Sequence, residues 1–457
     1  MEAGPPDRAR LIRTPLAFPK MFQTPLDWNF WTEPQVGLAN RHLYWPRGKM
    51  LGGSGSINGM VHMQACAADF AEWDAPGWEA MPADLLHSEP VAELNPLSAA
   101  FLDACEAAGL PGAAAITDAS QPVAAPFRLN IKNGKRWSAA DAYLRPALQR
   151  GNLTVWTSVH VRRVLCEGTR ASGVEYSRAG VVQTVAVTRE IVLCAGAVGS
   201  PHLLLLSGIG PAADLEACGV AVVADVAGVG RNLQDHLAAP VSYFCLEPVS
   251  FSGAATFANE WKYRLTGTGP LASNGAEVGA MVQSKAGLAA CDLEIVFAAG
   301  HYVDHGFAAP GGHGFSLIPV LLTPKSRGRI RLASANPDDA PRIDPGYLSD
   351  ATDLERLSEG VRFARRLLEQ AALAKYRGAP VNGQVLDAEE HVRQWGQTLY
   401  HPTGSCGMGS VVDAGLRVLG VAGLRVADAS VMPQVPRAHP NAATLWIAER
   451  AAQLLRA

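Results

Sequence analysis

The chain has 457 residues and a net charge of −3, with 48% hydrophobic and 18% charged residues. This length favours two domains over a single core, and the composition is typical of a globular enzyme. The near-neutral charge and scattered Lys and Arg argue against a nucleic-acid-binding surface.

The N-terminal third is irregular and then rich in glycine. Aromatic residues and prolines up to about residue 45 predict a chain that lies across a surface. The segment PRGKMLGGSGSINGM, residues 46–60, predicts a compact turn in which the backbone approaches a ligand closely. Ser54, Ser56 and Asn58 are suited to cap a following helix.

The next part predicts a helix and then several strands. Residues 97–109 have helical spacing, and residues 152–195 alternate as strands that end in the buried run EIVLCAG. In SPHLLLLSGIGP, Ser200 predicts an N-cap, Pro201 a first helical turn and Gly208 a helix end. This strand–glycine–helix order is typical of a βα unit in a doubly wound sheet.

The pattern changes from about residue 237 to residue 395. Strand-like runs alternate with Gly/Pro loops and predict an antiparallel sheet, followed by a helix with Thr352 and Glu355 as a capping box. Residues 401–457 return to a strand and an amphipathic helix. We therefore expect an α/β protein with a discontinuous domain of residues 1–236 and 396–457, into which residues 237–395 are inserted as an antiparallel-sheet substrate domain.

Targeting and metal signals are weak throughout. No run reaches the roughly 18 apolar residues of a membrane-spanning helix, and the polar N-terminus is unlike a secretory signal. The eight cysteines form no C-x-x-C pair and have no zinc-type spacing with His. We expect a cytoplasmic protein without a structural metal.

Three segments in order resemble the glucose–methanol–choline (GMC) oxidoreductases, in particular the choline and alcohol dehydrogenases. They are PRGKMLGGSGSINGM, then AGAVGSPHLLLLSGIGP with AGVGRNLQDH, and finally HPTGSCGMG with VADASVMPQVPRAHPNAATLWIAERAA. The resemblance extends over nearly the whole chain. It implies a flavoprotein with a Rossmann-like FAD-binding domain.

The resemblance also implies which residues contact FAD. They lie in the glycine-rich turn, in TSVHV, in ADAS and at the start of the last helix. By matching positions they are Gly52, Gly53, Ser54, Asn58, Met60, Val161, Asp428, Ala429, Asn441 and Thr444. The N-terminus of that last helix would place partial positive charge beside the flavin ring.

The sequence departs from the family pattern near its start. Glu2 matches the acidic residue that ends the second strand and accepts hydrogen bonds from the adenosine ribose. The preceding G-x-G-x-x-G unit, which cradles the pyrophosphate, has no match. We therefore expect an N-terminally truncated FAD domain that holds flavin weakly. Ile57 stands where some members tether FAD through a His, so we expect non-covalent binding.

Alcohol oxidation needs a base near neutral pKa, and histidine suits this task. By resemblance, His401 in HPTG is the base and His439 in AHPN orients the alcohol oxygen. A histidine before proline, without this context, is more often a loop residue. For His236 we favour a helix cap or interdomain hydrogen bond, and Glu277 is left as either a pocket residue or a paired structural carboxylate.

These observations favour an FAD-dependent alcohol dehydrogenase or oxidase acting on CH–OH donors. Two alternatives stay open: a non-catalytic truncated member that no longer holds FAD, and a member with lyase or photodecarboxylase chemistry. The sequence names neither the alcohol nor the electron acceptor, which we expect to be a quinone, a dye or oxygen.

Overall fold

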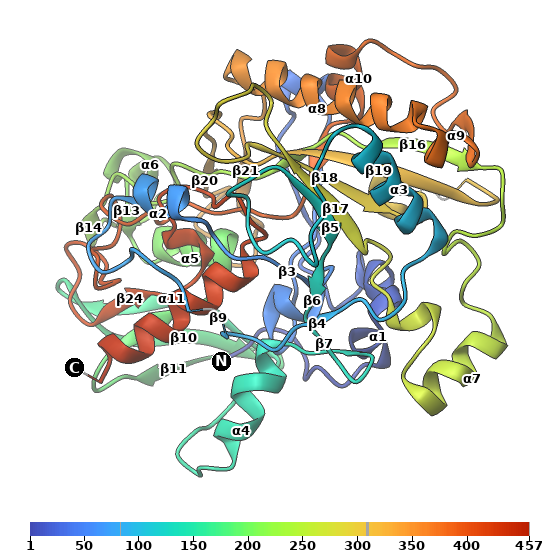
Figure 1. The fold of residues 1–457 in the computed structure, drawn as a ribbon. Helices are drawn as coiled ribbons and strands as arrows, with labels where there is room; N and C mark the ends of the chain where they lie inside the picture. The colour runs from blue at the N-terminus through green and yellow to red at the C-terminus, as the bar shows by residue number, and fades with distance from the viewer. Residues whose placement is uncertain (83, 308–309, 457) are drawn as a thin grey trace.

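The computed structural model describes residues 1–82, 84–307 and 310–456, and it has a mixed α/β fold (Figure 1). The expectation of an α/β protein is therefore confirmed. The α-helices are α1 (Arg10–Arg13), α2 (Ala67–Trp73), α3 (Pro96–Ala107), α4 (Arg145–Leu148), α5 (Gly196–Leu206), α6 (Ala212–Ala217), α7 (Phe257–Thr266), α8 (Ala351–Glu369), α9 (Ala371–Ala374), α10 (Ala388–Trp395) and α11 (Asn441–Leu454).

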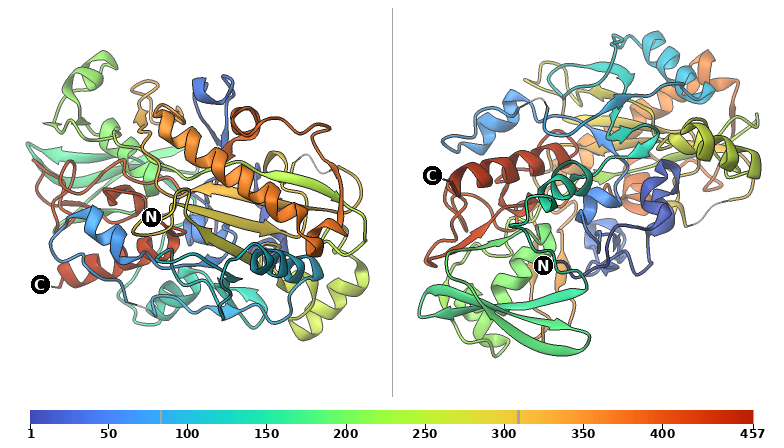
Figure 2. Two further views of the ribbon diagram at one scale, coloured as in Figure 1. Left: turned by 45° about the horizontal axis from the view of Figure 1, so that its top comes forward. Right: turned by 90° about the horizontal axis from the view of Figure 1, so that it is seen from below.

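An antiparallel sheet forms one half of the molecule and runs in the order β22–β16–β19–β18–β17–β5. Its strands are β22 (Arg377–Pro380), β16 (Val241–Cys245), β19 (Gly314–Leu321), β18 (Leu293–Ala298), β17 (Val278–Val282) and β5 (Val123–Pro126), joined by β15 (Leu237–Ala238) and β23 (Gln397–Thr398). The strands β17, β18 and β19 are buried almost throughout, which explains their continuous apolar runs. Helix α8 packs across β18 and β19, where Gly360 lets it approach closely because a Cβ there would lie 3.0 Å from Pro319 (Figure 2).

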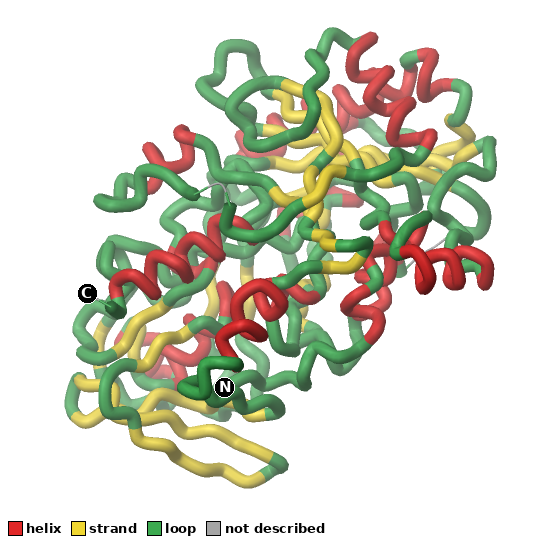
Figure 3. Tube along the Cα trace, turned by 60° about the horizontal axis from the view of Figure 1, so that its bottom comes forward, coloured by secondary structure: helices red, strands yellow, loops and turns green. Residues whose placement is uncertain are grey.

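The other half combines a twisted antiparallel ribbon with short parallel pairs. The ribbon is β9 (Val159–Glu167), β10 (Arg170–Arg178) and β11 (Val181–Ala186), which lie at one end of the molecule (Figure 3). Strands β12 (Ile191–Leu193) and β24 (Leu424–Val426) pair in parallel, and so do β13 (Ile209–Gly210) and β14 (Ala224–Asp225). The β12–β24 pair brings the C-terminal motifs back beside the segment that precedes α5.

The remaining strands are short and belong to small local sheets. They are β1 (Phe30–Trp31), β2 (Tyr44–Trp45), β3 (Val61–His62), β4 (Glu89–Pro90), β6 (Arg128–Leu129), β7 (Ile131–Lys132), β8 (Lys135–Arg136), β20 (Arg329–Arg331) and β21 (Arg342–Asp344).

Three details differ from the sequence-based expectations. We expected a doubly wound parallel sheet, but in the described residues the parallel pairing of strands is limited to the two short pairs β12–β24 and β13–β14. Parallel strands need long crossover connections, and few segments of this chain provide them. The antiparallel sheet also takes β5 and β23 from outside residues 237–395. The helix boundaries were misplaced: α8 is capped by Asp350 rather than Thr352, and α5 begins at Gly196, so Ser200 lies inside it.

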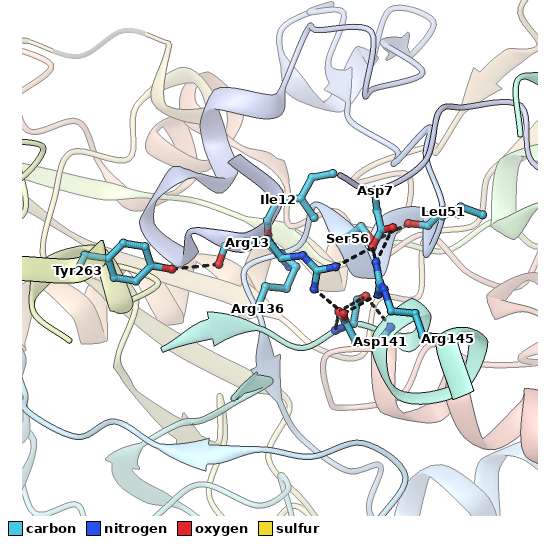
Figure 4. Close-up of polar contacts among 10 residues, drawn as sticks. Asp7, Ile12, Arg13, Leu51, Ser56, Arg136, Asp141, Arg145 and Tyr263 are labelled. Atoms are coloured by element: carbon cyan, nitrogen blue, oxygen red, sulfur yellow. Dashed lines mark hydrogen bonds and ion pairs between the residues drawn. The ribbon is translucent and has the colours of Figure 1, made fainter. Parts of the chain in front are cut away.

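A cluster of charges connects the N-terminal segment to α4 (Figure 4). Arg13 and Arg145 both donate to Asp141, and Arg145 also contacts Asp7 at 2.7 Å. Both carboxylates are buried, with 3% exposure for Asp7 and 7% for Asp141. Burial alone would raise the pKa of Asp141, but hydrogen bonds from Arg13 and Ser138 outweigh it and lower that pKa. The cluster therefore depends on ionised carboxylates.

We predict that Asp141→Asn lowers the free energy of unfolding by about 1–3 kcal/mol, measured by urea denaturation. The change leaves Arg13 and Arg145 with half of their counter-charge, and the cost is reduced because both guanidinium groups are partly exposed. Glu355→Gln, which removes the exposed pair with Lys285, serves as the control and should change stability by under about 0.5 kcal/mol. Equal effects of the two changes would contradict the prediction.

Candidate active site

A cavity of about 1810 Å³ lies between the two halves of the fold. Its wall includes every residue expected to contact FAD or to act in catalysis, although these residues are scattered from one end of the chain to the other. They are Glu2, Gly52, Gly53, Ser54, Asn58, Met60, Val161, His401, Asp428, Ala429, His439, Asn441 and Thr444. Their individual roles stay predictions, but the fold gathers them around one space.

The shape of the glycine-rich turn requires glycine at Gly52. Gly52 has φ +87°, and a Cβ there would lie 2.3 Å from Ser56 Oγ. A Cβ at Gly53 would meet nothing within 4 Å, so this edge of the turn is open. The fully buried Arg136 supports the turn by donating to Asn58 Oδ1 at 2.6 Å and to the Asn58 carbonyl at 2.7 Å. The turn is thus held rigid and presents backbone to the cavity.

Both oxygens of the Asp428 carboxylate accept hydrogen bonds from other residues of the protein. One oxygen accepts from the Gly196 amide at 2.9 Å and from Ser200 Oγ at 2.5 Å, and the other accepts from the amide and hydroxyl of Ser430. Asp428 therefore fixes the N-terminus of α5 against the loop after β24. Ser200 acts in this contact and not as the expected N-cap.

Glu2 is partly buried beside the cavity, and its side chain accepts from the Gly4 amide at 2.7 Å. Burial raises its pKa, and the Gly4 amide opposes that shift. Its backbone bonds to Trp156 and Val159, which joins the N-terminus to the strand that carries Val161. The acidic residue is thus positioned next to the predicted adenine contact.

The residues around the cavity fit FAD. The volume exceeds the roughly 300–1,000 Å³ of pockets for drug-sized ligands, which leaves room for a dinucleotide and a substrate. The open edge at Gly53 and the N-termini of α5 and α11 supply backbone donors and positive partial charge. Ile57 also lines the cavity, and its side chain offers no nucleophile for a covalent link.

The backbone of His401 is fixed from two sides. Its amide donates to Asp235 Oδ1 at 2.7 Å, and the preceding Tyr400 has φ +69°, a conformation that a tyrosine rarely adopts. Arg47 donates to the Tyr400 carbonyl at 2.7 Å and holds this conformation. Asp235 also accepts from Tyr347 and Thr398, and burial raises its pKa to about 6. These contacts orient the His401 ring toward the cavity.

His401 Nδ1 lies 2.9 Å from Nδ1 of His236, which is fully buried. His236 Nε2 lies 3.1 Å from the carbonyl oxygen of Leu322, an obligate acceptor, so Nε2 carries the proton. Burial lowers the pKa of His236 to about 3 and lowers that of His401 well below its usual value, and the neighbouring His439 and, for His401, Arg47 act in the same direction. Both rings are therefore neutral near pH 7.

His439 faces His401, with ring centroids 4.7 Å apart. Its Nε2 contacts Glu294 Oε1 at 3.1 Å, and the Glu294 side chain is fully buried. The other oxygen, Glu294 Oε2, has no hydrogen-bond partner among the described residues. The two histidines thus share one wall of the cavity, and each has its own buried partner behind it.

Sequence reasoning missed the residues behind the histidines. His236 makes the interdomain hydrogen bond that was favoured, to the Leu322 carbonyl of residues 237–395, but its second bond, to His401, was not expected. Its place at the end of the motif LQDH was the available signal. Glu294 lies in an ordinary apolar strand, LEIVFAAG, and only the charge inside that run distinguished it. Glu277, left open between two roles, is a paired structural carboxylate that accepts from the Asn95 amide and two serine hydroxyls.

In the described part of the chain no helix is long and apolar enough to cross a membrane. Family models described as GMC oxidoreductase match residues 32–238 and 324–448.

Dehydrogenases are among the curated relatives that match along the whole chain. An oxygen-dependent choline dehydrogenase of Photobacterium profundum is 38% identical over 100% of this chain and 88% of its own length. An alcohol dehydrogenase (acceptor) of Pseudomonas putida is 36% identical over 100% of this chain and 90% of its own length. The solved structure of pyridoxine 4-oxidase from Mesorbium loti superimposes with a TM-score of 0.88 at 31% identity, covering 99% of this chain and 92% of that one.

These matches confirm the resemblance that the motifs indicated, and family membership implies FAD as the cofactor. The chain belongs to the GMC oxidoreductase family.

Proposed function

We propose that this protein oxidises the CH–OH group of an alcohol to an aldehyde or ketone, with His401 as the base and His439 as the residue that orients the alcohol oxygen. The observation that carries the proposal is the facing pair of histidines in the cavity that the glycine-rich turn also lines. FAD, held without a covalent bond, would supply the hydride acceptor. In this proposal residues 1–236 and 396–457 form the domain that holds FAD. Residues 237–395 form the domain that contributes most of the side chains around the substrate.

The hydrogen bonds behind His401 favour one tautomer. Because His236 Nε2–H donates to Leu322, the Nδ1 atom of neutral His236 is an acceptor, and His401 must donate its own Nδ1–H to it. The lone pair of His401 is then on Nε2. This is the arrangement that a base needs, since Nε2 can accept the hydroxyl proton of an alcohol in the cavity.

His439 is suited to the complementary task. Its Nε2 is engaged with Glu294, which leaves Nδ1 to contact the alcohol oxygen. The contact with the buried Glu294 carboxylate fixes the orientation of the ring, so Nδ1 is held at one position beside the alcohol oxygen. One histidine therefore removes the proton while the other positions the atom that loses it.

The side chains near the histidines favour an uncharged, apolar alcohol. Val296 lies two residues from Glu294 on the same side of β18 and is paired with Ile318. Both line the cavity, as do Phe18, Leu271 and Leu399. Among the described residues, the carboxylates that line the cavity are Glu2, Glu190, Asp339 and Asp428. Glu2, Glu190 and Asp339 lie outside residues 237–298 and 399–441, which contain Glu294 and the two histidines. Asp428 lies within the second range, but both of its oxygens are already bonded inside the protein. Glu294 stands behind His439, but its side chain is fully buried and does not line the cavity, so a quaternary ammonium group there would meet no carboxylate directly.

We predict that His401→Ala lowers kcat for alcohol-dependent dye reduction by at least about 10²-fold, the usual scale of acid–base catalysis. His87→Ala, which changes an exposed histidine far along the chain from the motifs, is the matched control and should keep kcat within about twofold. The measurement uses FAD-loaded protein of each variant. A loss below about threefold for His401→Ala would rule out its role as the base.

We predict that His236→Phe lowers kcat by about 10–100-fold with little change in KM, because the acceptor that fixes the His401 tautomer is lost. His236→Gln should recover most of this loss, since its amide oxygen can accept from His401 and its amide nitrogen can donate to Leu322. Steady-state kinetics of the three proteins check this split. If Phe and Gln reduce kcat equally while both proteins stay folded, His236 has only a packing role.

We predict that an uncharged alkyl or aryl primary alcohol has a kcat/KM at least about tenfold higher than choline, because desolvating an unpaired cation costs free energy. Dye reduction with a panel of alcohols of matched size measures the ratio. Preference for choline would show that a counter-charge forms in the cavity and would refute this substrate class without affecting the roles of the histidines.

A further inference from the structure

Helix α7 projects from the body of the molecule (Figure 1), and apolar side chains on it are exposed. Phe257, Trp261 and Leu265 are 79%, 46% and 76% exposed. Their spacing of four residues places them on one face of the helix, where a globular protein normally carries polar groups. The helix itself is well defined, with Thr256 as N-cap and Gly267 ending it at φ +69°.

Basic residues flank this apolar face. At 100° per residue, Arg264 falls on one side of Phe257 and Lys262 on the far side of Leu265. Arg264 also lies over the Trp261 ring, 6.0 Å from its centroid. An apolar stripe with Trp, Phe and Leu between cations is typical of helices that lie in a lipid interface.

The local charge around α7 is positive. Glu260 pairs with Arg10 and with Arg264, each at 3.5 Å. Lys262 adds a third cation. The positive charges of Arg10, Lys262 and Arg264 therefore outnumber the single negative charge of Glu260. Such an excess complements the negative surface of a membrane that contains anionic lipid.

The opposite face anchors α7 to the protein. Tyr263 is buried, and its single hydroxyl proton can be donated to the Gly134 carbonyl at 3.0 Å or to the Arg13 carbonyl at 3.3 Å. The helix is therefore held in place with its apolar face directed outward.

Both chain segments that flank α7 line the cavity. Residues 251–255 precede the helix and residues 271 and 274–276 follow it, and all of them lie on the cavity wall. Asn274 donates to the Gly59 carbonyl at 2.7 Å, which connects the second segment to the glycine-rich turn. The apolar face of α7 is thus beside the cavity that holds the histidines.

We propose that α7 docks this protein on an anionic lipid surface and holds the cavity beside it. A second copy of the chain is the other occupant to consider. The three exposed side chains offer roughly 300–500 Å², below the about 800 Å² per partner of a stable interface. A lipid surface needs only the insertion of a few apolar side chains next to cations. The proposal goes beyond the proposed activity, because lipid binding requires no turnover.

The experiment is co-flotation of the full chain with vesicles of phosphatidylcholine containing about 30% phosphatidylglycerol, and with vesicles of phosphatidylcholine alone. The unchanged protein should float with the anionic vesicles, and about 0.5 M salt should weaken the binding. The triple change Phe257→Ser, Trp261→Ser and Leu265→Ser should lower the vesicle partition coefficient at least about tenfold.

A matched control replaces three exposed valines elsewhere, Val36→Ser, Val181→Ser and Val182→Ser, and should bind as the unchanged protein does. Thermal unfolding establishes that both variants are folded. The proposal is overturned if the unchanged protein does not float, or if the two triple variants bind equally. It is also overturned if sedimentation shows a dimer that the α7 variant dissociates while no protein binds vesicles. Activity plays no part in these outcomes, so failure of the proposed reaction would leave them intact.

Discussion

The pairing of β15 with β23 is the constraint on which the histidine site depends. In this short antiparallel contact Leu237 faces Thr398 and Ala238 faces Gln397. The Leu399 amide then donates to the His236 carbonyl at 2.9 Å, so the chain just before β15 runs beside the chain just after β23. This register carries His401 to His236 although 165 residues separate them. A slip of one residue would turn these side chains to opposite faces and separate the rings.

The same register concentrates polar groups in a region that is otherwise apolar. Asp235 is buried and satisfied by three donors, which offsets much of the cost of removing its charge from water. Glu294 is buried with a single partner, His439, and one of its oxygens is unpaired within the described residues. Groups that are costly for folding gather at functional sites, and here they stand directly behind the two histidines. The proposed tautomer of His401 depends on a different pair of contacts, from His401 to His236 and from His236 to the Leu322 carbonyl.

The two halves of the fold contribute different chemistry to the cavity. The parallel pair β12–β24 and the glycine-rich turn bring backbone amides and helix N-termini, which suit the charged part of a dinucleotide. Strands β18 and β19 bring apolar side chains, which exclude water from the place where a proton is removed.

The sequence by itself determined the family, the mixed α/β class, the helix near residues 97–109 and the motif residues that line the cavity. Glycine turns, buried strand runs and His-Pro motifs are local signals, so they can be identified without knowing their neighbours. Only the tertiary structure decided that β5 joins the antiparallel sheet and that His236 and Glu294 support the histidines. These features depend on which segments meet after burial, and pairings across more than a hundred residues leave no periodic trace in the chain.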